Sequence, residues 1–268
     1  MAPKKPALQT VLITGASSGI GEALAMRFAR AGHRLVLVAR DGAKLRALAA
    51  ALARVHGVGV SVEPVDLTQP DAARDLASRL KRTRIDIYVL VNNAGVLHQG
   101  GFAAMRAERH REMIDLNVSA LTAMLSHFLP GMLARGRGRV LNVASIAAFQ
   151  PIPMLATYAA TKAFVLSLTE SLADELDGTG VTATVLCPGI TDTRMLSGAV
   201  EANARLARLP GVLIGNVEQV AEEGYRACMA GDVIRIPGVV NQAMTLVSRA
   251  TPRWLLRRVA ARVARRAG

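Results

Sequence analysis

The sequence TGASSGIG at residues 14–21 lies between a short apolar run that begins at Val11 and a helical pattern that begins at Ile20. Its three glycines allow a tight turn and a close approach of the backbone to a ligand, because glycine has no Cβ. The helix that follows presents unpaired N–H groups at its N-terminus, where an anion is favoured. The stretch therefore predicts a turn that binds phosphate or pyrophosphate. Its spacing is GxxxGxG and not the more common GxGxxG, so a plain glycine-rich turn remains an alternative.

Around this turn, short β-branched runs alternate with longer helical patterns, as in a parallel sheet with crossover helices. We expect strands at residues 11–14, 35–39, 60–65, 88–92, 139–144, 181–186 and 233–236. We expect helices at residues 20–31, 43–56, 72–83, 108–133, 156–176, 217–230, 239–248 and 252–265. Pro130 is expected to kink or interrupt the fourth helix. Right-handed crossovers then give an α/β fold, a doubly wound parallel sheet of about seven strands with helices on both faces.

The bulk properties of the chain are those of a folded domain. There is no internal repeat or low-complexity linker, so we interpret residues 1–238 as one domain and residues 239–268 as a C-terminal helical extension of it. Hydrophobic residues make up 51% of the 268 residues, which excludes global disorder. The sequence has no uninterrupted apolar run of about 18 residues, and its N-terminus lacks the apolar core of a signal peptide. Two distant cysteines, Cys187 and Cys228, are expected to be reduced thiols of a cytoplasmic protein.

The net charge of +13 is concentrated at the C-terminus, because residues 249–268 hold seven arginines and no acidic residue. On a helical wheel Leu255, Leu256, Val259 and Val263 share one face of this segment, and arginines take the rest. This basic amphipathic pattern is compatible with contact to an anionic membrane surface. It is also compatible with a helix docked on the body of the protein, on a neighbouring subunit or over a cleft. Nucleic acid is not expected as a partner.

The end of the second expected strand bears on the choice of cofactor. A dinucleotide site for NAD usually carries Asp or Glu there, whereas a site for NADP carries a cation. This strand ends in Ala39 and Arg40, and the Arg40 guanidinium can bind a 2′-phosphate through two hydrogen bonds, with Ser17 placed to assist. Asp41 is expected to cap the second helix. We therefore expect NADP(H) in preference to NAD(H); the alternative is that Arg40 is a solvated surface residue.

A second set of polar residues indicates the chemistry. Ser145 follows the fifth strand, and Tyr158 opens the next helix with Lys162 four residues later on the same face. Free tyrosine, with a pKa of about 10, is too basic to exchange a proton at neutral pH, but an ammonium and a nicotinium charge close by would lower that pKa. Each residue alone is more often packing or solvated surface. Their order behind the glycine-rich turn predicts alcohol–carbonyl chemistry with Tyr158 as the acid/base.

As a set, these motifs resemble those of the short-chain dehydrogenase/reductase family, over about residues 10–236. The matching residues are TGASSGIG at 14–21, Asp66-Leu67, NNAG at 92–95, Asn117, Ser145, Tyr158, Lys162, the CPG of 187–189, Ile190 and Thr193. The resemblance implies a Rossmann-type fold with Tyr158 as the acid/base and Ser145 on the substrate carbonyl. It further implies that Lys162 binds the nicotinamide ribose and that Asn117 holds a water linking Lys162 to solvent.

The resemblance also implies a set of cofactor-binding residues. They are Gly15, Ser17, Ser18, Gly19, Ile20, Gly21, Arg40, Asp66, Leu67, Asn92, Ala94, Gly95, Tyr158, Lys162, Pro188, Gly189, Ile190 and Thr193. Among them Asp66 would recognise adenine and Asn92 the adenosine ribose region, while Ile190 and Thr193 would hold the carboxamide. Taken as residues only, the Asn-rich turn can be scaffold as well as site. No metal is expected.

The residues implied to face the substrate are mostly apolar. They are Ser145, Ile146, Ala147, Ile152, Leu155 and Met195. Their positions follow from the resemblance, whereas their apolar character is read directly from the sequence. We therefore expect a hydrophobic carbonyl or alcohol substrate, such as a steroid-like, fatty-acyl or aromatic compound, although ordinary loop packing would give the same pattern.

The sequence thus predicts an NADP(H)-dependent oxidoreductase that interconverts an alcohol and a ketone or aldehyde. We expect it in the cytoplasm, with a peripheral membrane contact through the C-terminal helix as a further hypothesis, and as a homodimer or homotetramer. The C-terminal extension departs from the usual end of the family and puts the usual tetramer in doubt. The alternative function is a catalytically silent, nucleotide-binding regulatory or scaffold protein on the same fold. The intact set of Ser145, Tyr158, Lys162 and Asn117 argues against that alternative.

Overall fold

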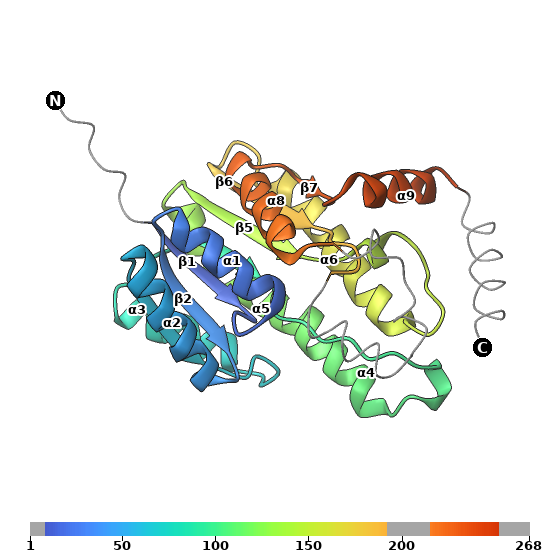
Figure 1. Cartoon of the computed structure of the whole chain (residues 1–268), viewed down its shortest axis with the longest axis horizontal. Helices are drawn as coiled ribbons and strands as arrows, with labels where there is room; N and C mark the ends of the chain where they lie inside the picture. Colours follow the sequence, from blue (N-terminus) through green and yellow to red (C-terminus); the bar gives the residue numbers. More distant parts are fainter. Residues whose placement is uncertain (1–8, 192–214, 252–268) are drawn as a thin grey trace.

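The structure, a computed structural model, describes residues 9–191 and 215–251 of the chain. The described residues form a seven-stranded sheet in the order β3-β2-β1-β4-β5-β6-β7, and every neighbouring pair is parallel (Figure 1). The strands are β1 (Thr10–Thr14), β2 (Arg34–Ala39), β3 (Val60–Pro64), β4 (Ile87–Asn92), β5 (Gly138–Val143), β6 (Val181–Leu186) and β7 (Ile234–Arg235). The chain runs outward from β1 to β3 and then returns to pair β4 with β1. This reversal opens a crevice at the carboxyl ends of the strands, where ligands bind in such sheets.

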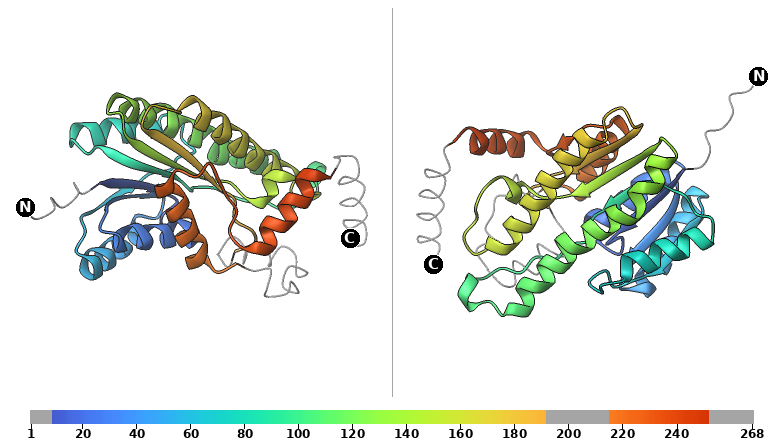
Figure 2. Two further views of the ribbon diagram at one scale, coloured as in Figure 1. Left: turned by 90° about the horizontal axis from the view of Figure 1, so that it is seen from above. Right: turned by 180° about the vertical axis from the view of Figure 1, so that it is seen from behind.

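Helices cover both faces of the sheet, as Figure 2 shows from above and from behind. One layer contains α1 (Gly19–Arg30), α2 (Gly42–His56) and α8 (Val217–Ala230). The other contains α3 (Ala72–Arg82), α4 (Ala107–Ile114), α5 (Leu121–Ala134) and α6 (Ala156–Glu175). A further helix, α9 (Val239–Ala250), follows β7. This arrangement confirms the predicted doubly wound α/β fold, and the expected strands are found within one residue of their predicted ends.

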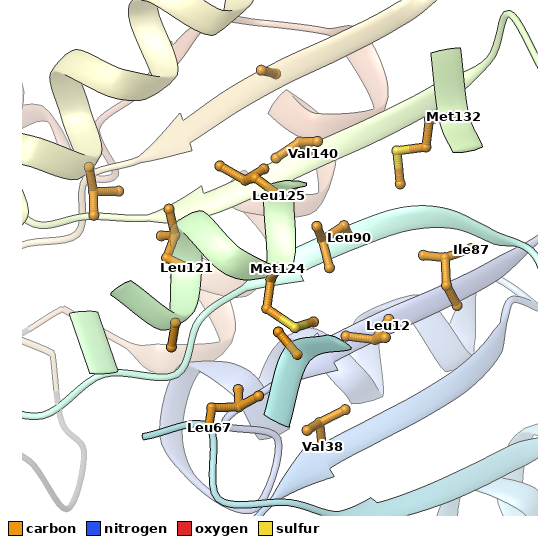
Figure 3. Close-up of a cluster of buried hydrophobic side chains, with 14 of the residues drawn as sticks. Leu12, Val38, Leu67, Ile87, Leu90, Leu121, Met124, Leu125, Met132 and Val140 are labelled. Atoms are coloured by element: carbon orange, nitrogen blue, oxygen red, sulfur yellow. The ribbon is translucent and has the colours of Figure 1, made fainter. Parts of the chain in front are cut away.

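Each central strand supplies side chains alternately to two cores. On β1, Val11 and Ile13 pack with α1, α2 and α8, while Leu12 packs toward α3 and α5. Figure 3 shows Leu12 of β1 with Leu90 of β4 in the second core, under side chains of α5. Strands that are buried on both faces are apolar along their whole length, which is why the sequence predicts their positions well.

The long helix before β5 differs from the prediction. Pro130 lies inside α5, which continues to Ala134, so of the two expected outcomes the interruption is wrong, and a kink at Pro130 stays a prediction. Pro130 and Ser126, the residue whose carbonyl loses its helical partner, are both exposed, and water can satisfy that carbonyl. The departure from α geometry is instead a π-helical turn, η2, at Asp115–Ala120, which contains Asn117. Such turns insert one extra residue per turn and are frequent at functional sites.

The helical stretch Ala107–Ala134 is long and apolar enough to meet the length and composition criteria for a membrane span. In the fold, however, Leu121, Met124 and Leu125 of this stretch lie in the core that covers the sheet (Figure 3). We therefore interpret it as a core helix.

Two other sequence predictions have clear outcomes. Cys187 and Cys228 are buried thiols not joined by a disulfide, as expected. Asp41 caps α2 as predicted, since its carboxylate accepts a hydrogen bond of 3.0 Å from the Lys44 backbone N–H. The helix expected at residues 252–265 lies outside the described residues.

A buried polar chain crosses the middle of the sheet. Asn92 at the end of β4 donates its Nδ2 to Asn142 Oδ1 of β5 at 2.9 Å, and Asn142 donates to Thr169 Oγ1 of α6 at 2.9 Å. Asn92 is only 3% exposed and Asn142 and Thr169 are fully buried. This network therefore ties β4 and β5 to α6, the helix that carries Tyr158.

This network predicts the effect of removing its central member. In Asn142→Ala, Asn92 loses its only amide partner inside the core, which leaves a buried donor unpaired and should lower the free energy of unfolding by about 2 kcal/mol. Urea denaturation followed by circular dichroism measures the loss. Ser171→Ala, which removes an exposed hydroxyl on α6, is the control and should change stability by less than about 0.5 kcal/mol. Equal stability of the two variants would contradict the prediction.

Candidate active site

A single cleft of about 670 Å³ runs along the carboxyl ends of the strands. It begins at Arg40 and Lys44 beside β2, passes the glycine-rich turn, and ends between Tyr158 and Ile152. Its volume lies in the usual range for a ligand site. From the predicted cofactor set it is lined by Gly15, Ser17, Ser18, Gly19, Ile20, Arg40, Asp66, Leu67, Ala94, Gly95, Tyr158, Lys162, Pro188, Gly189 and Ile190. Thr193 lies outside the described residues.

The glycine-rich turn has the geometry that its sequence requires. Gly15 and Gly19 adopt φ of +65° and +58°, values that favour glycine. A Cβ on Gly21 would lie 2.3 Å from the Gly15 carbonyl oxygen, so Gly21 serves the packing of α1 on the turn and does not line the cleft. The N-cap residue of α1, Ser18, makes no side-chain capping bond. The first N–H groups of α1 are therefore open to an anion in the cleft.

Asn93, not Asn92, is the asparagine that faces this turn. Its Nδ2 donates to the Thr14 carbonyl at 2.9 Å and to the Gly15 carbonyl at 3.3 Å, and its backbone N–H donates to Thr14 Oγ1 at 3.0 Å. Asn92 instead points into the sheet, toward Asn142, and is absent from the cleft lining. The alternation of side chains along β4 explains the difference, because neighbouring residues point to opposite sides. The prediction that Asn92 contacts the cofactor is therefore not supported by its position.

The end of the cleft beside β2, which we call the outer end, is lined by the positively charged side chains of Arg40 and Lys44. The Arg40 side chain is exposed, and its guanidinium has no hydrogen-bond or ion-pair partner in the described part of the chain. Asp41 pairs with Lys44 Nζ at 3.0 Å, so its carboxylate is already engaged. Burial raises the pKa of the Asp66 carboxyl, but hydrogen bonds from Thr68 and the charge of Arg40 outweigh this, and the net pKa is lowered. Asp66 is therefore an anion that can accept hydrogen bonds in the cleft.

At the inner end, Ser145, Tyr158 and Lys162 come together from two elements. Ser145 lies two residues after the end of β5 and caps the short 3-10 helix η3 (Ile146–Phe149), where its Oγ accepts a hydrogen bond of 3.2 Å from Ala147 N–H. Tyr158 and Lys162 lie one turn apart on α6 and are 7% and 5% exposed. Lys162 Nζ donates to the Val143 carbonyl at 2.9 Å and lies 5.8 Å from the centroid of the Tyr158 ring.

Burial shifts both of these groups. It raises the pKa of Tyr158 to about 12, against a smaller opposing effect of the hydrogen bond with Ser145. It lowers the pKa of Lys162 to about 8, with a smaller opposing effect from Cys187. Both shifts favour the neutral forms, since burial disfavours charge. Two strongly perturbed groups side by side in a cleft are typical of a catalytic site.

Asn117 does not line the cleft but supports it from the π-helical turn. Its Oδ1 accepts a bond of 2.9 Å from Val96 N–H, and its Nδ2 donates to the Val96 carbonyl at 3.0 Å and to Thr161 Oγ1 at 3.1 Å. A Cβ on Gly95 would lie 3.1 Å from Asn117 Oδ1 and 3.4 Å from Lys162 Nζ. Asn117 thus joins the segment after β4 to α6, next to the Lys162 ammonium.

The substrate end is walled mainly by apolar side chains. Of the predicted set, Ser145, Ile146, Ala147, Ile152 and Leu155 line the cleft, and Met195 lies outside the described residues. At this end of the cleft, sequence reasoning missed the polar lining residues Gln99 and Gln150. They follow the NNAG motif and Ser145 by a few residues, and this short spacing is the signal that could have indicated them. Next to Gln99, Gly100 N–H donates a hydrogen bond of 2.9 Å to the carbonyl of Met154, a residue with φ of +67°.

Comparisons with known proteins agree with this geometry. The family model described as short chain dehydrogenase matches residues 9–204. A 1-deoxy-11-beta-hydroxypentalenate dehydrogenase from Streptomyces exfoliatus is 41% identical over 196 residues, which are 71% of each chain.

Two solved structures share the whole fold. A short-chain dehydrogenase from Sphingobium yanoikuyae, in complex with NADPH, is 35% identical with a TM-score of 0.80, covering 91% of this chain and 96% of that one. A bulky-bulky ketone specific alcohol dehydrogenase from Comamonas testosteroni is 31% identical with a TM-score of 0.76, covering 91% of this chain and 95% of that one. The chain therefore belongs to the short-chain dehydrogenase family and is an oxidoreductase of the kind that acts on alcohol and ketone groups.

Proposed function

We propose that the protein is an NADP(H)-dependent oxidoreductase that interconverts an alcohol and a ketone or aldehyde on an apolar substrate, with Tyr158 as the acid/base. The observation that carries the proposal is the buried pair of Tyr158 and Lys162 beside Ser145 at the apolar end of the cleft. Burying an ammonium costs free energy, because the protein must replace the hydration of the charge. Groups with such strongly shifted pKa values are typical of functional sites. A catalytically silent nucleotide-binding protein would have no use for this arrangement.

The proton chemistry follows from the two shifted groups. In carbonyl reduction the Tyr158 hydroxyl donates its proton to the substrate oxygen, and in alcohol oxidation the phenolate accepts it. A pKa of about 12 holds Tyr158 protonated in the unliganded protein, so alcohol oxidation at neutral pH needs positive charge near the ring. The Lys162 ammonium supplies part of that charge, and Ser145 Oγ orients the substrate oxygen. When bound, the nicotinamide supplies or accepts the hydride and, in its oxidised form, adds a further positive charge.

The residues at the outer end of the cleft support NADP(H). The guanidinium of Arg40, which has no hydrogen-bond or ion-pair partner among residues 9–191 and 215–251, offers a fork of donors suited to a phosphate, and Ser17 lines the same cleft. The negative charge of Asp41, next to Arg40 in the sequence, is balanced by its ion pair with Lys44. The Sphingobium yanoikuyae enzyme, which shares this fold, is in complex with NADPH. The pyrophosphate would lie on the N-terminus of α1 above Gly15 and Gly19.

The walls of the inner end support an apolar substrate with a polar group. Ile146, Ile152 and Leu155 supply apolar surface, while Gln99 and Gln150 offer amide donors and acceptors. A site of this composition fits a bulky carbonyl compound whose second polar group meets a glutamine amide. The relative from Comamonas testosteroni is specific for bulky-bulky ketones, and the Streptomyces exfoliatus relative acts on a hydroxypentalenate.

The first prediction concerns the proton donor. Tyr158→Phe removes the hydroxyl and should lower kcat for NADPH-dependent ketone reduction by at least about 100-fold, since acid–base catalysis contributes roughly 10²–10⁴-fold. Binding of NADPH, followed by its fluorescence, should stay within a few-fold. Tyr225→Phe, on the opposite helical layer, is the matched control and should retain full activity. A kcat for Tyr158→Phe close to that of the parent would show that another group supplies the proton.

The second prediction concerns cofactor choice. Arg40→Ala should weaken NADPH binding about 10- to 100-fold, because charge-assisted hydrogen bonds to phosphate contribute roughly 1.5–3 kcal/mol. NADH binding should change little, since it has no 2′-phosphate. Arg46→Ala removes an exposed arginine of α2 outside the cleft and serves as control. Titration of all three proteins with both cofactors is the measurement, and an equal loss for NADPH and NADH would contradict the assignment.

The third prediction concerns the pH dependence of stability. The pKa of Lys162 is about 8 in the folded protein and 10.5 ordinarily, so the unfolded state binds more protons between these values and stability rises with pH. Above pH 9 the raised pKa of Cys228 acts in the opposite sense, which limits the clean window to pH 8–9.

Urea unfolding of the unliganded protein and of Lys162→Met tests this. Between about pH 7.5 and pH 9 the parent should gain about 1 kcal/mol relative to the variant, because a pKa unit corresponds to about 1.4 kcal/mol. Comparison with the variant removes the contributions of Cys228 and Tyr158, which both proteins share. Parallel stability profiles would mean that the Lys162 ammonium is not desolvated.

A further inference from the structure

Helix α9 leaves the sheet after β7 and extends beyond the body of the protein (Figure 1). Its first turn is anchored by side-chain hydrogen bonds to the preceding backbone, from Asn241 to the Pro237 carbonyl at 2.8 Å and from Gln242 to the Ile236 carbonyl at 2.9 Å. Asn241 also packs against the loop after β6, since a Cβ on Gly189 would lie 2.5 Å from its Nδ2. The helix therefore has a defined inner side that rests on the loops of the cleft.

That inner side is polar. Asn241 is partly buried, and Thr245, one turn later, is only 4% exposed. The outer side is apolar instead: Val239 is 81% exposed, Leu246 71% and Val247 64%. Val240 and Met244 are 45% and 52% exposed, and helical spacing places them on one stripe with Val247, next to the stripe of Val239 and Leu246. We call Val239, Val240, Met244, Leu246 and Val247 the outer face of α9.

This arrangement is the reverse of an ordinary surface helix, which turns its apolar stripe inward and its polar residues to water. The inversion cannot serve the packing of α9 on its own domain. A contiguous apolar patch of this kind marks a contact with a partner or a membrane. The outer face of α9 is therefore a surface that another apolar body covers.

The charge of the sequence that follows α9 indicates what covers the outer face. Residues 239–248 contain no charged residue, whereas residues 249–268 contain seven arginines, no acidic residue and the only tryptophan, Trp254. Anionic lipid headgroups attract such a basic segment, and tryptophan favours the membrane interface. An anionic bilayer complements this charge, whereas a second copy of the chain carries the same net charge of +13. We infer that the outer face of α9 and the arginines that follow it hold the enzyme on an anionic lipid bilayer.

The position of α9 gives this attachment a consequence for the cleft. The helix packs against η3, whose Ile146 and Ala147 line the substrate end. A bilayer contacting α9 would thus lie close to the entrance for an apolar substrate. This consequence rests on the proposed function, but the attachment itself does not.

Flotation of the full chain with vesicles tests the attachment. The protein should float with vesicles of phosphatidylcholine and phosphatidylglycerol, and stay behind with phosphatidylcholine alone. Raising the KCl concentration should weaken binding, because salt screens the arginine–headgroup attraction. Failure to bind the mixed vesicles, or equal binding to both vesicle types, would overturn the inference.

A variant of the outer face separates apolar insertion from charge. Leu246→Gln with Val247→Gln leaves the charge unchanged and should weaken binding to the mixed vesicles by at least about tenfold, since it removes two apolar side chains that would insert into the bilayer. Val55→Gln is the matched control: Val55 is 67% exposed on α2, at the other end of the molecule, and should bind as the parent does (Figure 1). Unchanged binding of the double variant would contradict the role of the outer face.

Two further measurements keep the outcomes distinct. Thermal unfolding of the double variant should match that of the parent, because Leu246 and Val247 are 71% and 64% exposed and contribute little buried area to the fold. Light scattering of parent and double variant tests the competing occupant. A dimer that dissociates on changing Leu246 and Val247 would show that a second copy covers the face, and would overturn the membrane assignment. Neither result depends on catalytic activity, so a failure of the proposed function would not be mistaken for a failure of the attachment.

Discussion

An ammonium group without bulk water is the constraint around which the inner end of the cleft is built. Lys162 is 5% exposed, and its Nζ is held by the Val143 carbonyl at the end of β5. Removing a charge from water is strongly unfavourable, so the surrounding structure must supply polar partners or let the group lose its proton. Its pKa of about 8 shows how far the balance has moved toward the neutral form. A change of charge in the cleft can therefore change the protonation state of Lys162 near neutral pH.

The fold brings the groups around Tyr158 and Lys162 from separate parts of the chain. The carboxyl ends of β5 and β6 meet at one edge of the sheet and supply Ser145 and the Pro188 carbonyl, which lie 3.5 Å apart. The π-helical turn places Asn117 against Val96 and Thr161, behind the ammonium. Beneath them the chain from Asn92 through Asn142 to Thr169 ties β4 and β5 to α6. The dinucleotide end is built in the same way, with Asn93 and Thr14 joining β4 to the turn after β1.

Much of this could be predicted from the sequence, because the strands are buried on both faces and the glycine-rich turn has strict backbone demands. The direction of the Asn92 side chain could not be predicted, because the sequence does not show which of the adjacent residues Asn92 and Asn93 points into the sheet and which faces the cleft. Pro130 was misleading because a proline is tolerated where the orphaned carbonyl faces water, and the π-helical turn has no simple sequence signature. Gln99 and Gln150 were missed because they reach the cleft from irregular segments, where periodicity gives no direction. The outer face of α9 required knowledge of which side rests on the body.

We propose that Tyr158 is the proton donor and that nearby positive charge controls its pKa. The direct measurement is an ultraviolet absorbance titration of tyrosinate, with Tyr158→Phe subtracted to isolate this one residue. In the unliganded protein Tyr158 should titrate with a pKa near 12. On saturation with NADP⁺ its pKa should fall markedly, because the added nicotinium charge favours the phenolate. A pKa that stays the same with and without NADP⁺ would contradict the account.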